Sequence, residues 1–165
     1  MNKSEFSNIR HYLGKSQVEI SELLCISPGA VKSYERGVSK IPAITERQML
    51  FLLFNKVSPV KMRPCWQIKK CPSKVKDRCP AWELRAGHIC WFITGTVCGG
   101  EAQENWDEKI NICRECEVFI LMFDHAMREL GNSKGYFDRC VVSDGVLPFK
   151  NDLRKLSSDE ISPSP

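Results

Sequence analysis

Residues 17–37 read QVEISELLCISPGAVKSYERG, and this stretch decides the fold of the first third of the chain. Ile20 and Leu24 lie four residues apart, so they share one face of a helix. Ser27 is a favoured helix N-cap, and Pro28 follows it at the first helical position, where a missing N–H costs no hydrogen bond. The pattern predicts two short helices joined by a tight turn, which is a helix-turn-helix.

The same stretch resembles the Cro/repressor-type (XRE) family of helix-turn-helix domains. The resemblance covers about residues 5–54 and rests on the Gln17…Ile20…Leu23-Leu24 start and on the Ser33-Tyr34-Glu35-Arg36-Gly37 ending. In that family the second helix enters the major groove of double-stranded DNA, and its N-terminal residues contact base edges. The resemblance implies seven DNA-binding residues: Gln17, Ser27, Pro28, Gly29, Lys32, Ser33 and Arg36.

Two departures from that family bear on how DNA would be read. Cys25 stands where the family usually has a glycine with left-handed backbone. Pro28 and Gly29 offer no side-chain hydrogen bond to a base, so direct readout rests mainly on Lys32 and Ser33. We therefore expect modest intrinsic specificity, and a homodimer, because two-fold pairing raises affinity. The competing interpretation of this segment is a small helical bundle for protein contacts.

Two apolar segments predict further helices. The segment Ile41–Phe54 is apolar on more than one face, which indicates core packing plus a surplus for a dimer seam or for the rest of the chain. Nearer the C-terminus, a helix is expected over about 114–130. Its apolar stripe consists of Phe119, Met122, Phe123, Ala126, Met127 and Leu130 and is expected to be mostly core.

Nine cysteines stand in 165 residues, and seven of them lie between Cys65 and Cys116. No signal peptide and no apolar run long enough to span a bilayer is evident, so we expect a cytoplasmic chain without a membrane partner. Clustered cysteines in that compartment indicate metal or redox chemistry rather than disulfides. The candidate metal ligands are Cys65, Cys71, Cys79, Cys90, Cys98, Cys113 and Cys116. A subset of four suffices for one zinc ion or one cubane cluster.

The spacing of these cysteines is compatible with both zinc and an iron–sulfur cluster. Cys113 and Cys116 form a C-x2-C pair, and the start of the helix expected after them would favour thiolates. Prolines follow Cys71 and Cys79, as near many iron–sulfur ligands, although zinc ribbons share this feature. The three surplus cysteines are either buried apolar side chains or ligands of a second, bridged metal.

Other residues of this segment have more ordinary interpretations. The stretch Gly95–Gly100 is too short for a phosphate-binding loop, and we interpret it as a tight turn that brings Cys98 inward. His88 is expected at the surface more often than on a metal. Core packing is favoured over a shell around a cofactor for Trp66, Trp82, Trp91 and Trp106.

Residues 62–122 resemble the bacterial "two-CW" cysteine-rich domain. The residues that carry this resemblance are Cys65-Trp66, Cys71, Cys79-Pro80-Ala81, Cys90-Trp91, Gly95-Thr96, Cys98-Gly99-Gly100, Lys109, Cys113, Cys116 and Val118-Phe119. That domain follows helix-turn-helix modules and occurs in chemotaxis and signalling proteins. The resemblance implies a sensory or ligand-bearing module and supplies no settled cofactor.

Together these patterns predict a mainly α chain in three parts. A helix-turn-helix domain is expected over 1–58, an irregular α+β cysteine-rich domain with a closing helix over 59–130, and a C-terminal extension with a disordered end over 131–165. The net charge is +4, and residues 1–58 hold eight Lys or Arg against five Asp or Glu. This surplus suits a phosphate backbone.

We expect a DNA-binding transcription regulator, not an enzyme, whose cysteines bind an iron–sulfur cluster, with 4Fe–4S favoured, or zinc, and sense redox state, oxygen or metal supply. One alternative is a regulator or adaptor with a purely structural zinc. A second alternative is an electron-transfer or redox protein, and the helix-turn-helix pattern and the lack of a nucleotide-binding motif argue against it.

Overall fold

The computed structural model describes residues 1–57 and 63–129. Over these residues the chain is mainly helical, with one two-stranded antiparallel sheet, as the sequence predicts. None of the helices in these two ranges has both the length and the apolar character needed to cross a membrane. Leu130 and the extension expected over 131–165 lie outside the described residues.

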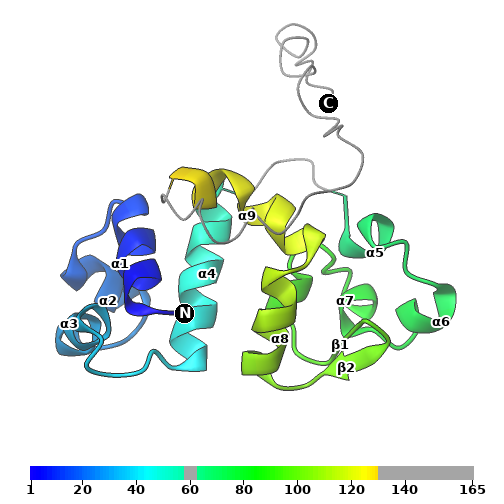
Figure 1. Cartoon of the computed structure of the whole chain (residues 1–165), viewed down its shortest axis with the longest axis horizontal. Helices are drawn as coiled ribbons and strands as arrows, with labels where there is room; N and C mark the ends of the chain where they lie inside the picture. Colours follow the sequence, from blue (N-terminus) through cyan, green and yellow to red (C-terminus); the bar gives the residue numbers. More distant parts are fainter. Residues whose placement is uncertain (58–62, 130–165) are drawn as a thin grey trace, which may run out of the picture.

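The N-terminal helices lie together at one end of the molecule (Figure 1). They are α1 (Lys3–Tyr12), α2 (Gln17–Leu23), α3 (Pro28–Arg36) and α4 (Ala43–Val57). The predicted cap of the second short helix is confirmed, because the Ser27 side chain accepts a hydrogen bond from the Ala30 amide at 3.1 Å. Helix α2 starts in the same way, with a reciprocal capping box between Ser16 and Glu19.

The turn between α2 and α3 bends through a left-handed residue. Cys25 has a φ of 51°, the conformation that glycine adopts without strain. The turn brings the predicted inner faces together, and Ile20, Leu24, Val31 and Tyr34 are all buried. The tight connection therefore comes from the backbone at Cys25 and from the packing on both sides of it.

The cysteine-rich segment, residues 63–129, consists of short elements. They are α5 (Cys65–Ile68), α6 (Ser73–Lys76), α7 (Pro80–Glu83), the 3-10 helix η1 (Cys90–Phe92), β1 (Thr96–Cys98), β2 (Glu101–Gln103), α8 (Trp106–Arg114) and α9 (Glu117–Glu129). Strands β1 and β2 pair with Cys98 opposite Glu101, across a two-residue turn. Gly99 and Gly100 both have positive φ there, as tight hairpin turns require. The predicted turn at Gly95–Gly100 is thus a β-hairpin.

The last helix is confirmed, but it begins three residues later than predicted. Arg114 is the final residue of α8, and α9 begins at Glu117. Asn105 caps α8, and a buried stripe of Trp106, Ile110 and Cys113 follows at helical spacing. Cys113 therefore lies in the last turn of α8, at the carboxyl end of that helix. The favourable helix start expected for the C-x2-C pair is wrong for Cys113, and Cys116 alone immediately precedes a helix.

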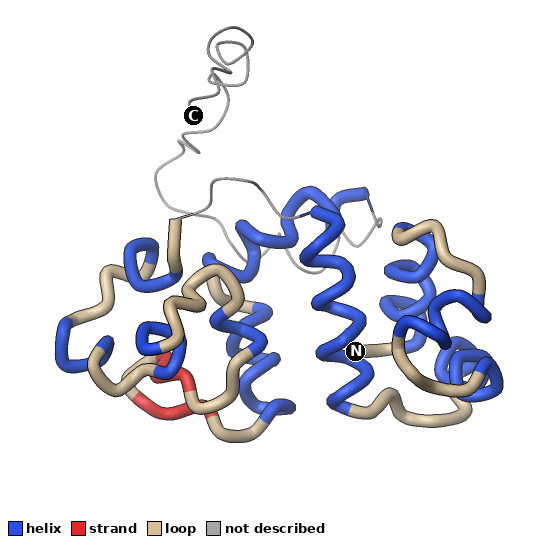
Figure 2. The backbone as a smooth tube through the Cα atoms, turned by 180° about the vertical axis from the view of Figure 1, so that it is seen from behind, coloured by secondary structure: helices blue, strands red, loops and turns tan. Residues whose placement is uncertain are grey.

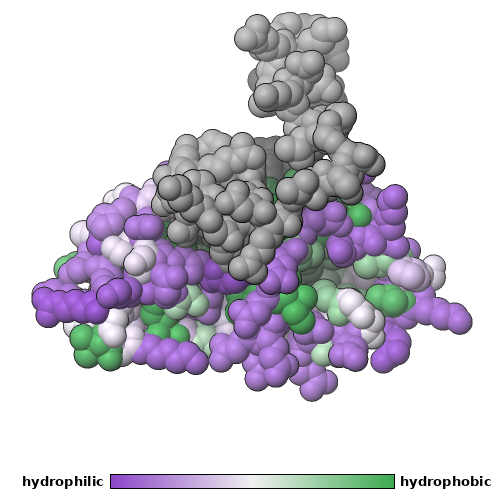
Figure 3. Space-filling view, in the orientation of Figure 1, coloured by the Kyte–Doolittle hydropathy of each residue, from purple (hydrophilic) through white to green (hydrophobic). Residues whose placement is uncertain are grey.

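One hydrophobic core joins the N-terminal helices to the cysteine-rich segment. Helix α9 packs across α4, as Figure 2 shows from behind. The ring of Phe54 in α4 lies 6.1 Å from that of Trp91 and 6.2 Å from that of Phe123. The surplus apolar surface of α4 thus packs on the cysteine-rich segment, and the face in Figure 3 is largely hydrophilic, with hydrophobic side chains in small separate groups.

Buried side chains of the closing helix agree with the predicted stripe. Phe119, Met122, Phe123 and Ala126 are all buried. The Met127 side chain lies outside the described part of the structure. The confirmed positions contribute to the shared core that fixes α9 against α4.

Candidate functional site

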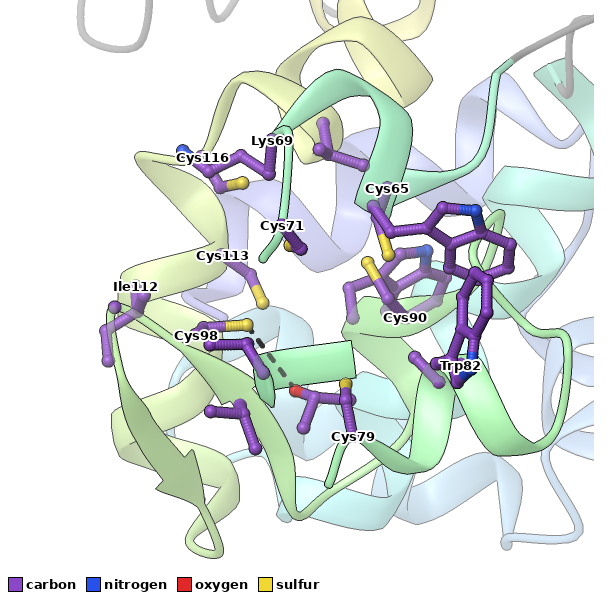
Figure 4. A pocket seen from close by; sticks show the side chains of 18 of the residues that line it. Cys65, Lys69, Cys71, Cys79, Trp82, Cys90, Cys98, Ile112, Cys113 and Cys116 are labelled. Atoms are coloured by element: carbon purple, nitrogen blue, oxygen red, sulfur yellow. Dashed lines mark hydrogen bonds between the residues drawn. The ribbon is translucent and has the colours of Figure 1, made fainter. Parts of the chain in front are cut away.

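All seven predicted ligand cysteines line one cavity of about 640 Å³ in the cysteine-rich segment (Figure 4). They come from separate short elements: Cys65 starts α5, Cys71 and Cys79 precede α6 and α7, Cys90 starts η1, Cys98 ends β1, Cys113 lies in the last turn of α8, and Cys116 stands between α8 and α9. The cavity lies within the range of about 300–1,000 Å³ that small-ligand sites occupy. The irregular fold of this segment therefore brings together thiols that are up to 51 positions apart in the sequence.

Aromatic side chains form much of the cavity wall. Trp66 and Trp82 meet edge to face with ring centroids 4.9 Å apart, and both line the cavity together with Trp91. Gly87 makes room for this wall, since a Cβ there would lie 2.5 Å from the Trp66 ring. Such walls lower the local dielectric and strengthen electrostatic effects inside the cavity.

The thiols influence one another's protonation. A hydrogen bond between Cys65 and Cys90 lowers the pKa of Cys65 and raises the pKa of Cys90. Burial raises the pKa of Cys71, and it raises the pKa of Cys113 to about 11. The raised pKa values of Cys71, Cys90 and Cys113 favour the neutral thiol at these three positions.

A buried lysine stands close to the same thiols. Lys109 is fully buried in α8, and its ammonium donates a hydrogen bond to the Thr96 hydroxyl. Its positive charge acts to lower the pKa values of Cys90 and Cys113, against the Cys65 hydrogen bond that raises the pKa of Cys90 and the burial that raises both. Over the described ranges Lys109 forms no ion pair with a carboxylate, so its charge lacks the anion that a buried cation requires.

A second buried donor lacks a partner beside the cavity. Trp91 is 1% exposed, and its Nε1–H finds no acceptor in the described part of the chain. Buried polar groups without a partner are rare and indicate a missing water, ion or ligand. Together with the Lys109 charge, this orphaned N–H indicates that the cavity suits an anionic group.

Seven thiols, a buried ammonium and one unsatisfied N–H fit a thiolate-bound centre in their chemistry. No three His, Cys, Asp or Glu residues of the described ranges, however, form a group that could hold a metal ion. A lone zinc needs its thiolates about 2.3 Å from the ion. A cluster places inorganic atoms between its ligands, so its thiolates stand farther apart and around a larger space. The seven thiols that line the cavity suit either kind of centre in their chemistry.

His88 and Cys25 lie away from the cavity. His88 is exposed and is not among the residues that line it. Cys25 is exposed in the N-terminal helices. The seven cysteines that line the cavity all belong to the cysteine-rich segment.

The residues predicted to bind DNA are not gathered in a cavity. On α3 and at its start, the exposed ones are Ser27, Pro28, Gly29, Lys32 and Arg36. Ser33 is half-buried, and its hydroxyl lies 2.7 Å from that of Ser39. Gln17 donates to Glu35 at 2.6 Å, so its amide is engaged within the protein. The exposed side of α3 is the surface that these positions share.

Sequence reasoning missed several residues of the site. Lys109 and Thr96 counted only as members of the two-CW resemblance, and no role was predicted for the ion pairs of Arg114. A signal was present for Lys109, because it follows Trp106 by three positions and so falls on the buried stripe of α8. A lysine on an apolar stripe indicates a buried charge and hence a nearby anion.

Compared with protein families, with curated proteins and with solved structures, the chain matches none. The two resemblances in the sequence therefore stay predictions, and function is argued from the cavity and from α2 and α3.

Proposed function

We propose that this protein is a DNA-binding transcription regulator whose cysteine-rich segment carries an iron–sulfur cluster and senses redox state, oxygen or metal supply. The observation that carries the proposal is the convergence of seven thiols on one cavity, next to a buried Lys109 that has no carboxylate partner among the described residues. Support for the DNA partner comes from α2 and α3, whose tight turn and exposed second helix suit a helix-turn-helix in the major groove.

Four of the seven cavity cysteines would hold a 4Fe–4S cluster. Such a cluster supplies a centre whose charge changes by one electron. Trp66, Trp82 and the buried Trp91 form part of the cavity wall, and the Trp91 N–H and Lys109 ammonium would stabilise negative charge there.

The side chains between the cavity and α3 provide a route for a signal. Arg114 follows Cys113 directly, and its guanidinium contacts Glu5 of α1 at 2.8 Å. Helix α1 in turn packs on α3, where Arg10 contacts Glu35 at 2.5 Å. A change at the cavity that moves α8 would shift these ion pairs and with them the orientation of α3.

The experiment that tests the proposal is anaerobic purification of the full chain, followed by metal and sulfide analysis, a visible spectrum and selection of bound duplexes from a random DNA pool. We expect a coloured protein with about four irons per chain that bleaches in air. Enrichment of a DNA sequence is expected, and its affinity should differ between anaerobic and air-exposed protein. If no DNA sequence is enriched, the proposal of a DNA-binding regulator is wrong, whichever metal the protein contains.

A colourless, air-stable protein with stoichiometric zinc would favour the alternative of a regulator or adaptor with a structural metal. In either case we expect a homodimer on DNA, because one module of this size reads few base pairs. Sedimentation of the protein with the selected duplex would test that expectation.

A further inference from the structure

The hydroxyl of Thr96 lies between the buried ammonium and a cavity thiol. Lys109 Nζ donates to Thr96 Oγ1, and Thr96 Oγ1 lies 3.6 Å from Sγ of Cys98, the contact dashed in Figure 4. Thr96 and Cys98 are two residues apart on β1, so their side chains lie on one face of the strand. The hairpin thus holds the hydroxyl against the sulfur.

The chemistry of these groups sets the direction of both hydrogen bonds. An ammonium can only donate, so Thr96 Oγ1 accepts from Lys109. Thr96 is 1% exposed, so its own proton needs an acceptor inside the protein. Among the contacts of the described residues, the sulfur of Cys98 is the acceptor in reach. The hydroxyl therefore donates to Cys98.

Hydrogen bonds donated to ligand atoms orient those atoms at metal centres, and hydrogen bonds to charged acceptors are roughly twice as strong as those between neutral groups. Thr96 of β1 supplies the hydroxyl that donates, and Lys109 of α8 occupies that hydroxyl's oxygen from the other side. Neither Thr96 nor Lys109 forms another side-chain contact with a carboxylate or amide oxygen in the described ranges that would account for its burial.

We infer that Lys109 and Thr96 fix Cys98 as one of the thiolate ligands of the metal centre in the cavity. The inference rests on the proposed function and selects one cysteine of the seven. In that role Cys98 would hold the metal as a thiolate, after giving its proton to water, and would keep the hydrogen bond from Thr96. Lys109 is a positioning residue that acts through Thr96 and through its charge.

The test compares matched variants of the full chain, purified anaerobically with their native metal. Thr96→Val removes the hydroxyl at constant shape, and Thr96→Ser keeps it. Lys109→Met removes the charge, Cys98→Ser removes the ligand, and Cys25→Ser removes an exposed thiol away from the cavity. Metal per chain is measured, then the affinity for that metal by competition with a chelator, and the midpoint potential if the protein is coloured. Circular dichroism verifies that each variant is folded.

We expect Thr96→Val and Lys109→Met to lose about 10- to 100-fold in metal affinity, the usual effect of removing an outer partner of a ligand. Their midpoint potentials should shift to more negative values, because a hydrogen bond to a ligand sulfur stabilises the more reduced, more negative state. Thr96→Ser and Cys25→Ser should match the wild type, and Cys98→Ser should hold less metal.

Equal affinity and potential in Thr96→Val and Thr96→Ser, or full metal content in Cys98→Ser, would overturn the inference while leaving the proposed cluster intact. A wild-type protein without any metal would overturn both the cluster and the role of Cys98. The metal content of the wild type therefore distinguishes the two failures.

Discussion

Arg114 connects the cavity to the N-terminal helices through Glu5, since its Nη1 lies 2.8 Å from the Glu5 carboxylate. Its Nη2 also lies 2.8 Å from Glu46 of α4. Both glutamates are about 5% exposed or less, and Glu46 accepts a further hydrogen bond from the Trp106 indole. Burial raises the pKa of Glu46, but the hydrogen bonds from the N-terminal ammonium and Arg114 outweigh it and lower that pKa.

Arg114→Gln should destabilise the protein by about 3 kcal/mol, because two buried carboxylates lose their shared cation. Lys40→Gln is the matched control, since the Lys40–Asp107 pair also joins the two parts of the chain but is exposed on both sides. The control should stay within about 0.5 kcal/mol of the wild type. Urea unfolding followed by circular dichroism measures both, and equal effects of the two variants would contradict the role given to Arg114.

Arg114→Gln also tests whether a signal passes from the proposed metal centre in the cavity to α3. In the wild type, removal of the metal with a chelator should speed amide hydrogen exchange in α3 (Pro28–Arg36), because α1 links α3 to Arg114. In Arg114→Gln the exchange of α3 should be fast with or without metal. Lys40→Gln should respond as the wild type does. Mass spectrometry of peptic fragments reads these rates, and an unchanged metal response in Arg114→Gln would show that the signal does not pass through this residue.

Cys25→Gly should stabilise the protein by about 1 kcal/mol, since a non-glycine residue pays about 1–2 kcal/mol for left-handed backbone. Part of that gain is lost to the greater freedom of glycine in the unfolded chain. Cys25→Ala keeps the strain and removes only the thiol, so it separates the two effects. Thermal unfolding of the three proteins measures the difference, and a Cys25→Gly variant no more stable than Cys25→Ala would contradict the argument from φ.

Glu35 should give the protein part of its acid sensitivity. Burial raises the pKa of Glu35, but hydrogen bonds from Arg10 and Gln17 outweigh it and hold that pKa below its ordinary value of 4.5. A carboxyl with a lowered folded pKa contributes stability that is present above the unfolded pKa and is lost as pH falls through the folded value. Glu35→Gln should therefore cost about 2 kcal/mol near neutral pH and much less in acid. Denaturant unfolding of both proteins from acid to neutral pH measures the difference in their free energies of unfolding. A difference that does not change with pH would rule out the ion pair as its source.

Arg36→Ala should weaken DNA binding uniformly across sequences and lower the slope of log affinity against log salt by about 1, as expected for one lost phosphate contact. Lys74→Ala is the control of equal charge change, because it alters exposed α6 at the other end of the molecule from α3 (Figure 1). Fluorescence anisotropy with the selected duplex measures both slopes. An equal fall in the two variants would indicate a general charge effect and no contact at Arg36.

The sequence alone was sufficient for the local structure of the N-terminal helices. Ser27 and Pro28 specify the start of α3, and the spacing of Ile20 and Leu24 specifies the buried face of α2. Caps and helical periodicity act over a few residues, so they can be read from neighbouring positions. The tight turn at Gly95–Gly100 was predicted for the same reason, because glycine marks positive φ.

The grouping of the seven cysteines was a prediction from composition, but their common cavity was decided by tertiary structure. Short helices interrupted by prolines give no periodic signal, so nothing in the sequence states which thiols face one another. The break between α8 and α9 was missed because the apolar stripe of α8 begins upstream, at Trp106. Helix boundaries near a C-x2-C pair depend on how both helices pack, and not on propensity alone.

The sequence by itself determined a helical chain with caps, turns and a cluster of thiols, since each of these depends on neighbouring residues. Only the tertiary structure decided that Lys109 approaches Thr96 and that Arg114 reaches Glu5 and Glu46. These contacts join residues 13, 109 and 68 positions apart. Such contacts depend on the packing of α9 against α4 and of α8 against the hairpin, and long-range packing leaves no pattern in a single sequence.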